Sequence, residues 1–164
     1  SLARPKLQRR MAIFAKIKKV RLYNVADLII PTIPIGIALG RIGNFINSEL
    51  YGRITDSKFC MIFPADPENC RYPSQLIEFL LEGVILFIMI YLLRNKIKSP
   101  GTLSWLFLLG YSVFRFISEF FREPDAQIGY LMGGMTLGQI FSILIMAVAA
   151  AGIKYSRAKH DSSI

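Results

Sequence analysis

Four long apolar stretches alternate with polar and basic segments along the chain. A hydrocarbon core about 30 Å thick takes about 20 helical residues to cross. Each stretch is long enough, or nearly so, and the pattern predicts four transmembrane helices, at about residues 25–46, 76–93, 103–121 and 135–153. We therefore expect an all-α fold, a polytopic integral membrane helix bundle that forms a single membrane domain over residues 1–164.

The first apolar stretch also carries residues that shape a helix. Pro31 and Pro34 predict a kink, because proline lacks the backbone N–H that an α-helix uses. Gly36 and Gly40 form a small-xxx-small face that favours close approach of a second helix. Gly52, past the end of the stretch, favours a tight turn.

Composition agrees with a membrane protein. Hydrophobic residues make up 53% of the chain, which is too apolar for an ordinary soluble domain of 164 residues. The net charge of +9 raises the question of a nucleic-acid partner. The basic residues lie in blocks between the apolar stretches and not along one face, so no nucleic-acid partner is predicted.

The basic blocks predict how the chain is oriented. They occupy residues 4–21, 94–98 and 154–159, and four crossings place all three on one side of the membrane. By the positive-inside rule, both termini are then cytoplasmic, and the loops 48–74 and 122–134 face outward. The first outer loop holds Cys60 and Cys70, in a compartment where a disulfide persists. A disulfide and two unpaired thiols both remain open.

Strongly polar side chains converge on the outer half of the predicted bundle. At about 1.5 Å per residue, Arg41 lies about 24 Å and Arg115 about 18 Å from the cytoplasmic ends of their helices. Glu78, Glu82 and Gln139 lie near the outer starts of helices that run the other way. An ionisable residue near the bilayer centre costs about 2.5 kcal/mol or more, so such residues indicate a functional site.

Several of these side chains share a helix face at spacings of three or four residues: Arg41 with Asn44, Arg115 with Glu119, and Glu78 with Glu82. Each pair can point into the bundle together. For Glu78 and Glu82 an alternative is that they form ion pairs that hold helices together, since an intramembrane charge needs a partner in any case.

Residues 40–52 read GRIGNFINSELYG, which resembles the signature of the bacterial prolipoprotein diacylglyceryl transferases, Gly-Arg-x-Gly-Asn-aromatic-apolar-Asn-x-Glu-x-x-Gly. The resemblance continues in the family's order through YPSQLIEFLLEG (72–83), GYSVFRFISEFFREPDAQ (110–127) and MTLGQIFS (135–142). It covers residues 11 to about 152.

The resemblance implies transfer of the diacylglyceryl group of phosphatidylglycerol to the lipobox cysteine of a prolipoprotein, which forms a thioether and is the first step of bacterial lipoprotein maturation. It implies a multi-pass protein of the bacterial cytoplasmic (inner) membrane with its active site toward the outer leaflet. The implied partners are phosphatidylglycerol, the prolipoprotein lipobox peptide and membrane lipids, with no cofactor and no metal.

The resemblance also assigns residues. The catalytic set that it implies is Arg41, Asn44, Glu49, Gly52, Arg115 and Glu119. The headgroup-binding set is Arg41, Arg115, Tyr111, Asn47 and Gln139. The chemistry supports the arginines, because a planar guanidinium binds phosphate oxygens bidentately and stabilises the charge of a leaving phosphate. The thiol needs a base or a positive field, and the family's histidine and the arginines both remain candidates.

Two departures from the family pattern concern histidine. The family's HGG-type motif would fall close to Ser1, but residues 1–10 are basic and contain no histidine and no glycine pair. Tyr72 stands where many members have histidine before Pro-Ser-Gln-Leu. We therefore expect a C-terminal portion that lacks the upstream helices, or a replaced N-terminus.

Two other functions stay open at this point. One is a truncated, inactive remnant of the same enzyme. The other is a small channel or transporter subunit, because intramembrane charges also mark ion paths. A conduction path would spread polar groups across the whole bilayer, whereas these stop in the outer half.

Overall fold

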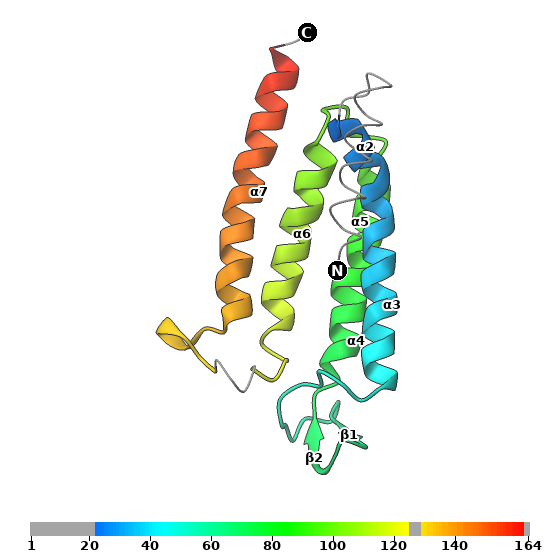
Figure 1. Ribbon diagram of the computed structural model, residues 1–164, viewed down its shortest axis with the longest axis vertical. Helices are drawn as coiled ribbons and strands as arrows, with labels where there is room; N and C mark the ends of the chain where they lie inside the picture. The colour runs from blue at the N-terminus through cyan, green and yellow to red at the C-terminus, as the bar shows by residue number, and fades with distance from the viewer. Residues whose placement is uncertain (1–21, 125–128, 163–164) are drawn as a thin grey trace, which may run out of the picture.

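A computed structural model describes residues 22–124 and 129–162, which form four helical columns lying side by side (Figure 1). The basic block at residues 4–21 and the departure at residues 1–10 lie outside the described residues. Three helices are long and apolar enough to cross a membrane: Tyr23–Ile46, Ser74–Leu93 and Leu137–Asp161. The remaining column, Thr102–Ser118, is a shorter apolar helix.

The first column consists of α2 (Leu22–Ile29), the 3₁₀ turn η1 (Ile30–Thr32) and α3 (Ile33–Ile46). The predicted irregularity is confirmed, because Pro31 and Pro34 lie in the first turns of η1 and α3. There the missing N–H costs no helical hydrogen bond. The column begins three residues before the predicted helix and ends where it was predicted to end.

The second column consists of α4 (Ser74–Glu78), the π-helix η2 (Phe79–Ile85) and α5 (Leu86–Leu93). Glu78, Glu82, Leu86 and Ile90 follow one another at intervals of four residues, and all four are fully buried. In a pure α-helix each such step overshoots a full turn by about 40°. The wider turn of η2 offsets that drift. One side of the column is therefore charged in one half and apolar in the other.

The third and fourth columns are α6 (Thr102–Ser118) and α7 (Leu137–Asp161), and the short 3₁₀ turn η3 (Met132–Gly134) precedes α7. α6 ends three residues earlier than predicted, while α7 continues to Asp161. Side chains cap both helices. Asp27 of α2 accepts hydrogen bonds from the backbone N–H groups of Gly101 (2.6 Å) and Ser104 (2.9 Å). Thr136 caps α7 in a capping box with Gln139.

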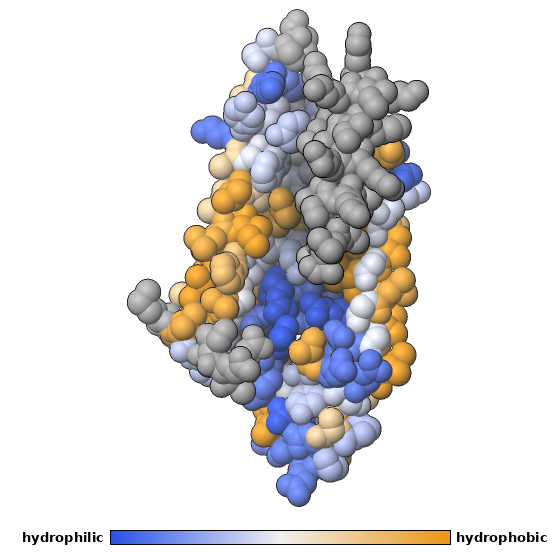
Figure 2. Space-filling view, viewed as in Figure 1, coloured by the Kyte–Doolittle hydropathy of each residue, from blue (hydrophilic) through white to orange (hydrophobic). Residues whose placement is uncertain are grey.

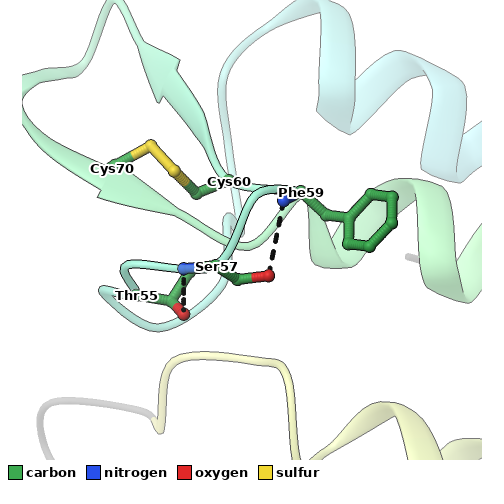
Figure 3. Close-up of a disulfide and its surroundings, with 5 residues drawn as sticks. All are labelled: Thr55, Ser57, Phe59, Cys60 and Cys70. Atoms are coloured by element: carbon green, nitrogen blue, oxygen red, sulfur yellow. Dashed lines mark hydrogen bonds between the residues drawn. A yellow bond between two sulfur atoms is a disulfide. The ribbon is translucent and has the colours of Figure 1, made fainter.

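The segment after α3 contains a small antiparallel hairpin, β1 (Met61–Phe63) and β2 (Asp66–Arg71). The expectation of a purely helical fold is therefore wrong for this loop. A disulfide joins Cys60 to Cys70 beside the hairpin (Figure 3). Of the two alternatives for these cysteines, the structure has the disulfide. In the preceding turn the Thr55 and Ser57 hydroxyls accept backbone N–H groups.

The first three columns share one apolar cluster. Its buried members are Ile30, Leu86, Ile90, Leu103 and Phe107. Many other large apolar side chains point outward, as expected where a helix surface meets lipid.

The predicted glycines do not mark a close helix approach within the described residues. Within the described residues nothing lies within 4 Å of a side chain placed at Gly36 or Gly40. Instead, Gly83 of η2 packs against Ala38 of α3, where an added Cβ would lie 2.7 Å from the Ala38 Cβ.

The two ends of the bundle are made of different elements (Figure 1). We call the end with β1, β2 and the start of α7 the hairpin end, and the end with the α5–α6 connection and the end of α7 the turn end. The basic blocks at residues 94–98 and 154–159 both belong to the turn end.

Candidate active site

Five charged side chains from three columns meet toward the hairpin end, and we call them the charged cluster. Its members are Arg41 of α3, Glu78 of α4, Glu82 of η2, Arg115 of α6 and Glu119 at the C-cap of α6. Figure 2 shows hydrophilic surface gathered in a recess of this half of the molecule, between apolar flanks. The prediction that these residues lie together is confirmed, and their location in the outer half of the membrane stays a prediction.

Glu78 holds both arginines. One carboxylate oxygen lies 3.1 Å from Arg41 Nε, and the other accepts a hydrogen bond from Arg115 Nη1 at 2.7 Å. The Glu78 side chain is fully buried, whereas the two arginine side chains keep 15% and 16% of their surface exposed. The carboxylate therefore lies deeper than the guanidiniums and sets their separation.

Glu82 is held less completely. Its Oε2 accepts a hydrogen bond from Arg41 Nη2 at 3.2 Å, while its Oε1 lies 3.8 Å from Arg115 Nη1. That second oxygen is buried and has no hydrogen bond within the described residues. The alternative in which Glu78 and Glu82 form ion pairs between helices is confirmed as geometry.

Glu119 connects the charged cluster to the last column. It pairs with Arg115 Nη2 at 2.6 Å, on the helix face that the two residues were predicted to share. Its other oxygen accepts a hydrogen bond from the Thr136 hydroxyl at 3.0 Å. Since Thr136 also caps α7, the start of that helix is fastened to the site. Gly138 allows this approach, because a Cβ there would lie 2.7 Å from the Glu119 carboxyl carbon.

The loop after α3, residues 47–52, carries the second half of the signature and is fastened by backbone contacts. Gln75 Nε2 donates to the carbonyl of Glu49 at 2.7 Å, and Ser74 Oγ donates to that of Leu50 at 3.0 Å. Both donors are fully buried. Gly52 lies where a Cβ would be 2.6 Å from the Tyr72 carbonyl oxygen, so no side chain fits there.

Two further arginines tie this loop to its surroundings. Arg53 donates to the carbonyls of Arg122 (2.8 Å) and Glu119 (3.2 Å). Arg71 of β2 donates to the carbonyl of Gly52 at 3.1 Å and pairs with Asp66. The loop is therefore held on one side by the hairpin and on the other by the end of α6.

Asp66 in the hairpin is stabilised as a carboxylate. Hydrogen bonds from the Asn69 amide and the Arg71 guanidinium hold the pKa of Asp66 below its ordinary value of 3.8. This ionised group keeps Arg71 in place beside Gly52.

The other predicted site residues lie around the charged cluster without joining it. Asn44, Asn47 and Glu49 make no side-chain hydrogen bond or ion pair within the described residues, and Asn47 and Glu49 are exposed. Tyr111 is one turn before Arg115 on α6 and stacks on Phe107. Gln139 is buried and uses its side-chain oxygen in the α7 cap.

The arrangement leaves donors for an anion. Within the described residues Arg41 Nη1 and Arg115 Nε make no hydrogen bond, and both arginines are partly exposed. Guanidinium groups bind phosphate oxygens in paired hydrogen bonds. The buried carboxylates hold these donors in position before a ligand arrives.

Several contributors were absent from the predicted site list. Glu78 and Glu82 were recognised only as intramembrane acids, and their burial cost was the signal that could have placed them in the site. Ser74, Gln75 and Arg71 act through contacts distant in sequence, which no local pattern reveals.

These observations first define a class, a helical membrane protein in which a charged cluster joins three helical columns and keeps guanidinium donors for an anionic ligand. The comparison with known proteins makes this specific. Residues 9–155 match the family described as "Prolipoprotein diacylglyceryl transferase", so the chain belongs to that family. The resemblance noted at residues 40–52 is confirmed.

Comparison with individual relatives supports membership of this family. The chain is 43% identical over 152 residues to a protein of Chlorobaculum tepidum, a match that covers 92% of this chain and 53% of that one. It is 50% identical over 137 residues to a protein of Rickettsia bellii, covering 82% and 52% of the two chains. Both are named phosphatidylglycerol–prolipoprotein diacylglyceryl transferase. The chain spans about half the length of these relatives.

Proposed function

We propose that the protein transfers the diacylglyceryl group of phosphatidylglycerol to the lipobox cysteine of a prolipoprotein. The observation that carries this proposal is the pair Arg41 and Arg115, both held by one buried carboxylate and both with spare N–H groups. Membership of the transferase family and the names of the relatives support the substrates.

The chemistry requires a cationic site. The cysteine sulfur attacks the glyceryl carbon that bears the phosphate, a C–S bond forms, and the C–O bond to the phosphate breaks. The leaving glycerol phosphate gains negative charge as the bond breaks. Arg41 and Arg115 stabilise this charge in a site of low dielectric, where such donors act most strongly. Asn44, Asn47, Glu49, Tyr111 and Gln139 orient the two substrates around them.

We further propose four membrane crossings with both termini cytoplasmic, in the bacterial inner membrane. Three helices meet the length and hydropathy needed, and α6 has 17 apolar-rich residues, near the lower limit for a span. The basic blocks at the turn end support a cytoplasmic location for that end. The charged cluster then faces the outer leaflet, from which an exported prolipoprotein is reached.

The direct test replaces Arg41 by alanine in the protein at its natural length and measures lipidation of a test prolipoprotein in isolated membranes. Arg94→Ala is the matched control, because Arg94 is at the turn end and contacts the ring of Tyr91. We expect R41A to lose transfer while still inserting, and R94A to keep it. Normal lipidation by R41A would remove the assigned role.

Two other measurements separate the alternatives. Reporter fusions at Asn95 and at Asp56 are expected to report opposite sides of the membrane, and the same side for both would overturn the proposed topology. Ion conduction by purified protein in liposomes, without thioether formation, would favour a channel.

A further inference from the structure

The charged cluster contains one more carboxylate than guanidinium groups, since Glu78, Glu82 and Glu119 share Arg41 and Arg115. Burying an uncompensated charge is costly, and an anionic headgroup adds a further negative charge to the same site. A proton is the smallest addition that relieves this excess. The question is which carboxylate receives it.

Glu82 is the carboxylate with the weakest hold. Both oxygens of Glu78 lie within 3.1 Å of a guanidinium nitrogen. Glu119 has a guanidinium nitrogen at 2.6 Å and the Thr136 hydroxyl at 3.0 Å. Within the described residues, three buried carboxylate oxygens of the charged cluster have no hydrogen bond: Glu78 Oε2, Glu82 Oε1 and Glu119 Oε2. The oxygens of Glu78 and Glu119 lie 3.1 Å and 2.6 Å from a guanidinium nitrogen, whereas Glu82 Oε1 lies 3.8 Å from Arg115 Nη1.

We propose that Glu82 is the proton acceptor that activates the acceptor cysteine. This inference rests on the proposed function and adds to it the base that the sequence left open. The cysteine thiol gives its proton to the Glu82 carboxylate, directly or through one water. The sulfur forms the C–S bond as the C–O bond to phosphate breaks, and the departing glycerol phosphate takes the proton from Glu82. Atoms and charge balance, and nothing is oxidised or reduced.

The surroundings of Glu82 explain how substrate binding would prepare it. The ionisable groups that face it belong to α3, α4 and α6: Arg41, Glu78, Arg115 and Tyr111. When the arginines turn toward a phosphate they share their N–H groups with it, and Glu82 loses part of its ion pairing. The guanidiniums also uncover the deeper carboxylate as they move. Headgroup binding therefore makes Glu82 a stronger base at the step that needs one.

Other bases in this chain are poorly placed. His160 is the only histidine in the sequence, and it lies in the last turn of α7, at the turn end. The histidine expected before Pro-Ser-Gln-Leu is Tyr72, whose ring packs edge-on against Phe121. Within the described part of the chain, Glu82 Oε1 is a buried carboxylate oxygen with no hydrogen bond, 3.8 Å from Arg115 Nη1, on a side chain that contacts both arginines.

The test compares Glu82→Gln with Glu78→Gln in the protein at its natural length, using vesicles of phosphatidylglycerol and a lipobox peptide. Glutamine keeps an acceptor for Arg41 but removes the base. We expect E82Q to lower kcat by about 100-fold at pH 7 with little change in KM for the lipid. The deficit should shrink by about tenfold per pH unit toward pH 8.5, where the thiol ionises by itself.

A selenocysteine peptide gives an independent measure, because a selenol is ionised at neutral pH and needs no base. With this acceptor we expect the rate of E82Q to return to near that of the wild type. The rate of E78Q should stay low, because the role of Glu78 is to hold the arginines. A deficit of E82Q that is independent of pH and unaffected by selenocysteine would show a purely structural role and overturn the proposal.

The outcomes separate the two proposals. If the wild-type protein forms no thioether, the proposed function fails, whereas an active wild type with an E82Q variant of equal rate refutes only the role of Glu82. If the E82Q variant does not insert into the membrane, the Glu82→Asp variant tests the role of Glu82 instead. The shorter carboxylate should slow transfer and keep the pH dependence of the wild type, and loss of that dependence would contradict the proposal.

Discussion

The hairpin end and the turn end of the bundle both contain acids on apolar helices, but the contacts of these acids differ. At the turn end, Asp27 accepts three hydrogen bonds, from Gly101 N, Ser104 N and Ser104 Oγ. At the hairpin end, Glu82 keeps an oxygen without any hydrogen bond in the described residues. An acid whose oxygens are all paired fastens helices together. An acid with an oxygen that has no hydrogen bond is available to accept a proton.

The strongest test of this difference between the two ends removes one charged side chain at each end. Arg115→Ala should lower lipidation by about 1,000-fold, because it removes a donor aimed at the leaving phosphate and leaves buried carboxylates unpaired. Asp27→Ala should keep lipidation within about threefold and lower the stability of the start of α6 by about 1 kcal/mol. Transfer assays in membranes with equal amounts of inserted protein check both. Equal loss of transfer in the two variants would contradict the distinction.

A second comparison uses two glycines, Gly52 in the signature at residues 40–52 and Gly36 just before it. Gly52→Ala forces a side chain against the Tyr72 carbonyl oxygen and should displace the loop at residues 47–52. A misplacement of about 1 Å lowers rates by about 100-fold. The Cβ added by Gly36→Ala has no described residue within 4 Å, so this variant should leave transfer unchanged. Lipidation assays on both variants measure this, and a normal rate for G52A would refute the need for a close approach.

A third prediction concerns the disulfide. Cys60→Ser with Cys70→Ser should destabilise the hairpin by about 2–3 kcal/mol, because the bond closes a short loop. We expect faster proteolysis within residues 55–70 and an unchanged rate at the α5–α6 connection. Transfer should fall only severalfold, because Ser74 and Gln75 still hold the signature loop. Transfer as low as in R115A would show that the hairpin belongs to the chemistry itself.

The smallest effect is expected from pH. Because the pKa of Asp66 is lowered in the folded hairpin, its ionisation contributes stability above its ordinary value of 3.8. That contribution is lost as pH falls through the folded value. Limited proteolysis at pH 5 and below pH 3.8 should show the hairpin loosening only at the lower pH. Asp66→Asn should abolish the change, and a pH effect that survives in this variant would assign it to another group.

Local pattern predicted much of this architecture. Apolar length located all four helical columns, the prolines located the irregular turn, and a spacing of four residues placed Arg115 and Glu119 on one helix face. The signature at residues 40–52 led to the family that the comparison confirmed. These features are encoded within one or two helical turns, which is the range over which a single sequence is informative.

The remainder depends on contacts between distant segments. That Glu78 bridges Arg41 and Arg115 requires knowing how three columns face one another. The hairpin forms in a loop without strong alternation of apolar and polar residues, so strand pairing was not predicted. The open face at Gly36 and Gly40 shows that a small-residue motif permits close packing without specifying where it occurs.

The π-helix η2 also constrains how this family can change over time. The seven residues from Phe79 to Ile85 keep Glu82 aligned with Leu86 on one side of the column. Substitutions within η2 that preserve size leave this alignment intact. Insertion or deletion of a single residue would turn the charged half by about 100° relative to the apolar half and separate Glu78 from both arginines. Apart from Glu82 and Gly83, we therefore expect relatives to vary the identity of residues in this stretch far more readily than their number.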